Sequence, residues 1–127
     1  MTTPPRSQTL LNHMDWNIQH FEQILKNEKT DYYRDASIQR FCLVFEATLK
    51  TLSAFAEESG AEAQTTEECF QFAETRQWTD DTSKPVLNDY QSVKDGFKPS
   101  LAETVYPRLK DHHAFFQKLQ STVSQSS

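Results

Sequence analysis

Four polar residues in the middle of the chain have the chemistry of a binding site: Gln39, Arg40, Glu46 and Lys50. They belong to a segment whose apolar residues recur at steps of three and four, which predicts an α-helix. Gln39, Glu46 and Lys50 share one face of that helix, and Arg40 is turned about 100° from Gln39, to the edge of the apolar face. Such a stripe can line a cleft or a dimer seam. It can equally be a solvated face, with Glu46 and Lys50 paired four residues apart.

Metal and nucleophile chemistry have no support in the sequence. The four histidines are His13, His20, His112 and His113. None has an acidic residue three positions before it, or three or four after it, so the Glu-x-x-His motif of metal-binding bundles is absent. No serine or cysteine nucleophile stands in a recognisable motif, and the isolated Cys42 and Cys69 suit buried packing positions. We therefore expect no catalytic residues, no metal site and no cofactor.

The helix that carries the polar stripe is expected to be the spine of the fold. Asp31 is a suitable N-cap and Gly60 a suitable stop. About 28 helical residues would span about 40 Å, the full length of a small bundle. Its apolar face consists of Ile38, Phe41, Cys42, Phe45, Leu49, Leu52, Phe55 and Ala56.

Apolar periodicity and capping signals predict the other helices. A first helix is expected to end at about Asn27, and a third to run from a capping box at Thr65 and Glu68 to about Gln77. After a polar turn at 79–83, a fourth helix is expected from Pro85 to Gly96.

The last predicted helix runs from Leu101 to about Thr122 behind a second capping box, Ser100 with Glu103, and Pro107 predicts a kink within it. Residues 9–120 are expected to form a single helical-bundle domain. Residues 1–8 are expected to be a flexible arm and residues 121–127 a disordered tail whose removal after Leu119 would be nearly silent.

Composition agrees with an all-α protein. Only two of the 127 residues are glycine, too few for β-hairpins or a phosphate-cradling loop. No signal peptide or membrane-length apolar run is evident, so we expect a cytoplasmic protein with no membrane contact. The prediction is an up-and-down antiparallel bundle of four or five helices.

The formal net charge of −5 is unevenly distributed. Residues 57–81 hold eight acidic residues and one basic residue, whereas the rest of the chain is slightly basic. The acidic stretch is either a solvated face or a docking surface for a basic partner. A chain of this charge lacks the basic stripe typical of nucleic-acid binding, so we expect none directly.

The segment Arg34–Leu52, RDASIQRFCLVFEATLKTL, resembles the signature helix of the nucleotidyltransferase substrate-binding proteins. These are helical bundles of the HEPN superfamily, small bacterial partners of minimal nucleotidyltransferases. Ile38–Phe41, Phe45 with Glu46, and Lys50–Leu52 carry the likeness. By helix order it covers roughly residues 10–120.

The resemblance also implies where a ribonuclease site would lie. Active superfamily members are similar to metal-independent ribonucleases with an arginine, four residues, a histidine and often a tyrosine two positions later. In helix order these positions fall on Tyr90, Asp95 and Phe97, with Asp89 matching the acid before the arginine. The proton-transferring and anion-stabilising groups are therefore replaced.

The resemblance implies a non-catalytic interaction or nucleotide-binding subunit, a homodimer that partners a nucleotidyltransferase in a toxin–antitoxin-like pair. Two alternatives stay open: a ribonuclease toxin with an atypical site, and a bundle that binds an unrelated small molecule. The expected partner cleft consists of Gln39, Arg40, Glu46, Asp89, Tyr90 and Asp95.

Overall fold

The computed structural model describes residues 4–126, which contain six α-helices, two short 3-10 helices and no strand. The elements are α1 (Arg6–Leu25), α2 (Asp31–Glu58), α3 (Thr66–Thr75), η1 (Asp81–Ser83), α4 (Lys84–Asp95), α5 (Pro99–Val105), η2 (Tyr106–Arg108) and α6 (Leu109–Ser126). Because α5, η2 and α6 follow one another without a gap, they form one bent helical segment. The all-α bundle predicted from the sequence is confirmed.

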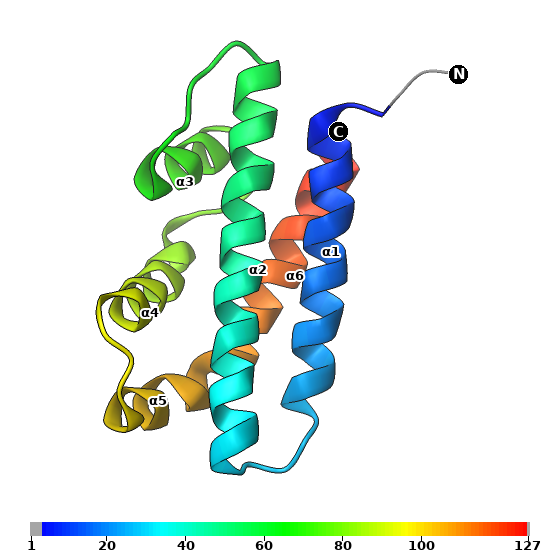
Figure 1. The fold of residues 1–127 in the computed structure, drawn as a ribbon. Coiled ribbons are helices and arrows are strands. Elements are labelled where there is room, and N and C mark those ends of the chain that lie inside the picture. Colours follow the sequence, from blue (N-terminus) through cyan, green and yellow to red (C-terminus); the bar gives the residue numbers. More distant parts are fainter. Residues whose placement is uncertain (1–3, 127) are drawn as a thin grey trace.

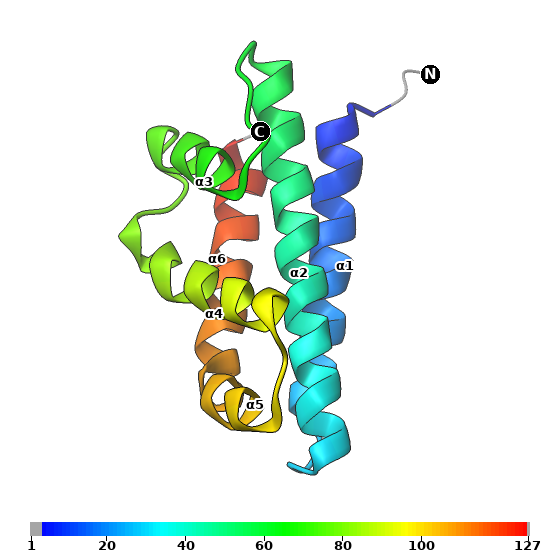
Figure 2. The same cartoon turned by 60° about the vertical axis from the view of Figure 1, so that its left-hand side comes forward.

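The helices are arranged around α2. The chain runs down α1, up α2, back down through the short helices α3 and α4, and up again along α6 (Figure 1). Turning the molecule by 60° shows α1 on one side of α2 and the short helices α3, α4 and α5 on the other (Figure 2). Side chains on α2 can therefore contact side chains on α4.

Local capping chemistry sets the ends of α2. The Thr30 side chain accepts a hydrogen bond from the Tyr33 backbone N–H at 3.1 Å, so Thr30 is the N-cap and the expected Asp31 lies in the first turn. The helix ends at Glu58, and Gly60 follows with φ of 85°, a left-handed conformation that favours glycine. The predicted capping box of Thr65 and Glu68 opens α3 as expected.

Aromatic side chains from α1, α2 and α6 fill the core. Phe21, Phe41, Phe45 and Phe116 have no exposed surface, and their rings lie at tilted or edge-to-face angles with centroids 6.0–6.4 Å apart between contacting pairs. The apolar face of α2 is thus buried as the periodicity predicts.

The predicted kink lies at Pro107. Proline lacks the N–H that a continuous helix needs, and the chain passes through η2 between α5 and α6. The second capping box is wrong, however: Lys98 is the N-cap of α5 and makes no side-chain cap bond. Glu103 instead accepts hydrogen bonds from Lys29 at 2.6 Å and Arg34 at 2.9 Å, because Lys29, just before α2, and Arg34, near its start, lie beside it.

Helices extend closer to both ends of the chain than the sequence suggested. Ser7 is buried in α1, and its hydroxyl donates to Glu58 at 2.6 Å, which ties the start of α1 to the end of α2. At the other end α6 continues to Ser126, and Val123 is 1% exposed because it completes the apolar face of the helix. Helix therefore covers residues 6–8 of the predicted arm and 121–126 of the predicted tail. Residues 1–3 and 127 lie outside the described residues.

Within residues 4–126, no helix is both long enough and apolar enough to cross a membrane.

Candidate functional site

Asp89 lies at the centre of a side-chain cluster that joins α4 to the bent helical segment. One of its oxygens lies 2.6 Å from His112 Nε2 and accepts from Arg108 Nε at 2.8 Å. The other oxygen accepts from Arg108 Nη2 at 2.6 Å. The side chains of Asp89 and His112 are 8% and 4% exposed, whereas that of Arg108 is 45% exposed. We call these three residues the Asp89 cluster.

Ionised groups hold the Asp89 cluster together. Burial disfavours the charged form of Asp89, but the hydrogen bonds from Arg108 and His112 outweigh it and lower the pKa of this carboxyl. The hydrogen bond to Asp89 raises the pKa of Arg108 in turn. The His112 ring stacks on Phe41, with centroids 5.1 Å apart and planes 25° apart. Its buried ring is therefore held by Asp89 and Phe41 rather than presented to solvent.

Tyr90 and Glu46, both predicted cleft residues, meet in the structure. The Tyr90 hydroxyl donates to Glu46 at 2.9 Å, and its ring stacks on Phe45 with centroids 3.9 Å apart. Burial and the neighbouring carboxylate raise the pKa of Tyr90 well above its ordinary value. Tyr90 thus anchors α4 to α2 as a neutral phenol.

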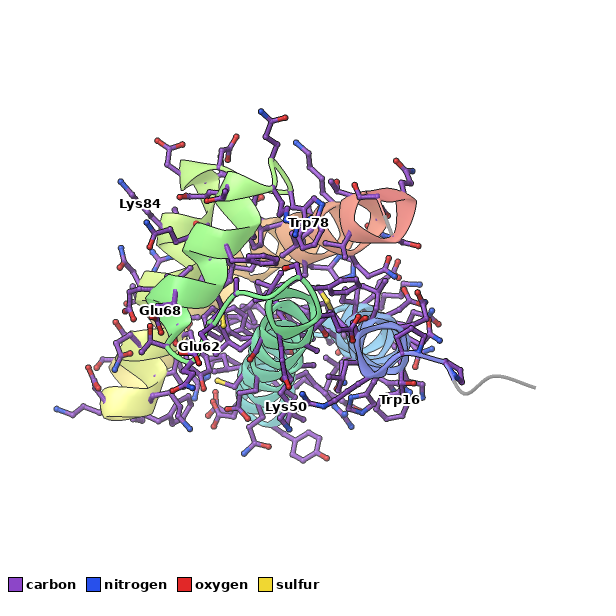
Figure 3. The ribbon with its side chains drawn as sticks, turned by 90° about the horizontal axis from the view of Figure 1, so that it is seen from above. Trp16, Lys50, Glu62, Glu68, Trp78 and Lys84 are labelled. Carbon is purple, nitrogen blue, oxygen red and sulfur yellow. The ribbon has the colours of Figure 1, made fainter. Side chains whose placement is uncertain are left out.

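Glu46 pairs with α4 and not along its own helix. Its carboxylate lies 3.7 Å from Lys94 Nζ, whereas the described residues include no Glu46–Lys50 ion pair. The sequence alternative that paired Glu46 with Lys50 is wrong, because the packing of α4 brings Tyr90 and Lys94 closer. Lys50 lies exposed on the outer side of α2, away from Trp78 (Figure 3).

An apolar groove of about 530 Å³ runs between α2 and the C-terminal end of α4. Leu43 and Phe97 on its walls are 46% and 45% exposed, so two large apolar side chains meet solvent in one groove. Burial raises the pKa of the half-buried Cys42 thiol to about 11. We call this surface the α2–α4 groove; its lining is Asp35, Ile38, Gln39, Cys42, Leu43, Val93 and Phe97.

The predicted cleft residues therefore divide into separate places. Gln39 lines the α2–α4 groove, Glu46 and Tyr90 bond one another, and Asp89 belongs to its own cluster. Asp95 is exposed and accepts a hydrogen bond from Gln91 at 2.8 Å. Arg40 is half-buried, and its side chain makes no hydrogen bond or ion pair within residues 4–126. The six do not converge on one cleft.

Three residues that hold this region together were not predicted from the sequence: Arg34, Arg108 and His112. The Arg34 side chain is 8% exposed and bonds Asp35 and Glu103, both at 2.9 Å. Arg108 and His112 are four residues apart, so they face the same way across the end of η2 and the first turn of α6. That spacing was the one sequence signal that could have suggested a shared site. Their acidic partner, Asp89, is about 20 residues away in sequence, and no local pattern reveals it.

The acidic side chains of residues 57–81 are exposed, and Glu62 and Glu68 lie on one side of the molecule in the view from above (Figure 3). Several of these carboxylates already have structural contacts: Glu58 with Ser7, Glu68 in the α3 capping box and Asp80 as the cap of η1. The described residues contain no group of three or more His, Cys, Asp or Glu side chains that could hold a metal ion.

Comparison with known proteins identifies the fold. A protein from Thermus thermophilus, known from its crystal structure, superimposes with a TM-score of 0.75 at 22% sequence identity. The match covers 85% of this chain and 96% of that one. At this identity the likeness shows the fold alone. No protein-family model matches the chain, and no curated protein matches it.

Proposed function

We propose that the chain is a non-catalytic interaction subunit that docks onto a protein partner through the α2–α4 groove. The partner class follows from the resemblance to the nucleotidyltransferase substrate-binding proteins of the HEPN superfamily: a nucleotidyltransferase-like protein in a toxin–antitoxin-like pair, with this chain as a homodimer. The fold shared with the Thermus protein agrees with the helical bundle that the resemblance implies.

The observation that carries the proposal is an exposed apolar surface. It lies beside the positions that align with the ribonuclease motif. Phe97, which stands at the tyrosine position of the motif, lines an apolar groove together with the exposed Leu43. Exposed apolar surface of this kind commonly marks a protein-binding site. Its lining includes no arginine, lysine or histidine, the side chains that would stabilise phosphate charge and move a proton in the ribonuclease motif.

The two other motif positions support the same conclusion. Tyr90, at the arginine position, is buried and bonded to Glu46, so it serves packing. Asp95, at the histidine position, is an exposed carboxylate that would repel a phosphate. The Asp89 cluster does contain an arginine and a histidine, but both bond the same carboxylate and the imidazole is buried.

The test is complex formation with a nucleotidyltransferase encoded beside the gene, using both purified proteins. Leu43→Asp places a charge in the apolar groove and is expected to weaken binding by at least about tenfold. Tyr32→Asp is the matched control, because Tyr32 is 74% exposed on the same helix and does not line the groove. Equal affinities of the two variants, or no complex with wild type, would contradict the proposal.

The homodimer is tested separately by sedimentation. A dimer should give about twice the mass of the 14.7 kDa chain across micromolar concentrations. A compact monomer at high concentration would contradict the homodimer. The docking proposal would still be tested by the binding experiment.

A ribonuclease remains the second candidate because one observation favours it. Arg108 and His113 reproduce the arginine–four residues–histidine spacing, outside the positions given by helix order. In the structure Arg108 is bonded to Asp89, whereas the ring of His113 packs against Phe21 of α1. Metal-independent cleavage of total RNA that is lost in Arg108→Ala and in His113→Ala, or in Arg40→Ala, would favour this candidate over docking.

A further inference from the structure

A second groove lies between the C-terminal end of α1 and the start of α6, and none of its lining residues belongs to the α2–α4 groove. Its volume of about 730 Å³ is within the range of about 300–1,000 Å³ that small-molecule sites occupy. Lys26 from the end of α1 faces it across from Tyr106, Lys110, His113 and Gln117. We call it the α1–α6 groove.

The cations of the α1–α6 groove lack protein partners. The side-chain ammonium groups of Lys26 and Lys110 form no ion pair or hydrogen bond within residues 4–126, and Glu22 is the one carboxylate in the lining of this groove. The nearby Lys29, by contrast, is paired with Glu103 at 2.6 Å. A chain of net charge −5 thus has two unpaired ammonium groups facing one hollow.

Two further hydrogen-bonding side chains accompany these charges. The half-buried His113 has an Nε2 atom that is covered by protein and has no hydrogen-bond partner among the described residues. Because this nitrogen is covered, it can reach a ligand in the groove only when the ring rotates, and its lack of a partner in the present position favours that rotation. The Gln117 amide likewise has no hydrogen bond within the described residues, and the Tyr106 ring forms an aromatic wall.

We propose that the α1–α6 groove binds the phosphate group of a small phosphorylated molecule. Ammonium groups bind phosphate as point charges, and imidazole and amide N–H groups add directional hydrogen bonds to its oxygens. The groove has room for more than a bare ion, and its aromatic wall is the Tyr106 ring, over which Lys29 Nζ lies 5.7 Å from the centroid. This inference is independent of docking at the α2–α4 groove.

The experiment follows backbone and imidazole NMR signals of the ¹⁵N-labelled full chain during titration with inorganic phosphate and with adenosine monophosphate at constant ionic strength. Saturable shifts are expected around Lys26, Lys110 and His113 with both probes. The Lys26→Ala/Lys110→Ala variant should raise both dissociation constants by at least about tenfold, and His113→Gln should raise them as well.

A matched variant separates a built site from general charge. Lys84→Ala/Lys98→Ala removes the same charge from two exposed lysines outside the α1–α6 groove and should leave binding unchanged. Equal weakening in both double variants would overturn the proposal, as would shifts that never saturate. A short single-stranded RNA that binds through Lys26 and Lys110 far more tightly than adenosine monophosphate would also overturn it and reassign the groove to nucleic acid.

Discussion

The Nε2 atom of His112 lies 2.6 Å from a carboxylate oxygen of Asp89, so a side chain on α6 is bonded to one on α4. Arg108 binds the same carboxylate with two nitrogens, at 2.8 and 2.6 Å. The short helix α4 makes few other polar contacts with α6. The Asp89 cluster therefore fixes where α4, and with it the wall of the α2–α4 groove, lies against α6.

Replacement of Asp89 by asparagine is expected to destabilise the fold. The change keeps the shape but leaves Arg108 and His112 without a carboxylate. Breaking a buried pair costs about 3–5 kcal/mol, and we expect about 2–3 kcal/mol because Arg108 is half-exposed and partly screened by solvent. Urea denaturation of Asp89→Asn measures the loss. Glu57→Gln, in an exposed pair with Arg6 at 3.6 Å, should cost less than about 1 kcal/mol and is the control.

The contribution of Asp89 should also depend on pH. Burial opposes its ionisation, yet hydrogen bonds from Arg108 and His112 lower its pKa below the ordinary 3.8. A carboxyl whose pKa is lower in the folded state stabilises the protein above the unfolded-state pKa and loses that effect as the pH falls through the folded value. The difference in unfolding free energy between wild type and Asp89→Asn should thus shrink as the pH falls below about 4. A difference that grows on acidification would show that the cluster is not an ion pair.

The same cluster shows why part of the site could not be predicted from the sequence. The apolar steps along α2, the capping box at Thr65 and the bend at Pro107 are local patterns, and the structure confirms all three. Asp89 and His112 are 23 residues apart, and only the packing of α4 against α6 brings them together. Polar partners of this kind depend on tertiary contacts that no periodicity encodes.

Local signals also fail where a tertiary partner competes for the same side chain. Glu103 has the spacing of a capping box with Ser100, yet it bonds Lys29 and Arg34 instead. Glu46 has Lys50 four residues away on its helix, yet it bonds Tyr90. A charged cross-helix partner or a buried phenol outweighs an exposed local pair worth a few tenths of a kcal/mol.

Phe45 should be among the most important residues for stability. It is fully buried and packs against Tyr90, Phe70 and Phe116. Phe45→Ala leaves a cavity between α2, α3, α4 and α6 and is expected to cost about 3–5 kcal/mol in denaturant unfolding. Leu43→Ala, on the same helix but 46% exposed, should cost less than about 1 kcal/mol. Similar losses for the two would mean that the face of α2 is placed wrongly.

Removal of the last two turns or so of α6 is expected to be destabilising, contrary to the nearly silent truncation that the sequence suggests. Val123 is 1% exposed within α6, and burying a valine side chain contributes about 1.5–3 kcal/mol. Truncation after Leu119 should lower the unfolding free energy by about that amount. Truncation after Ser124 keeps Val123 and is the control. If truncation after Leu119 left the thermal unfolding temperature unchanged, the tail would be dispensable for stability, as the sequence suggests.

Cys42 should be a slow nucleophile although it lines the α2–α4 groove. Burial, and then the nearby Glu46 carboxylate, raise its pKa to about 11, so at neutral pH only about one molecule in ten thousand carries the reactive thiolate. With Cys69→Ser as the background, iodoacetamide should modify Cys42 at least about a hundredfold more slowly in the native protein than in urea. The native rate should rise about tenfold per pH unit through the range where the fold survives.

The same reaction reports on the groove. A partner that occupies the α2–α4 groove covers Cys42 and should slow its native modification further, whereas adenosine monophosphate, expected in the α1–α6 groove, should leave the rate unchanged. Rapid modification at neutral pH would mean that the thiol is neither desolvated nor close to Glu46, and the packing of α2 against α4 would then differ from the structure.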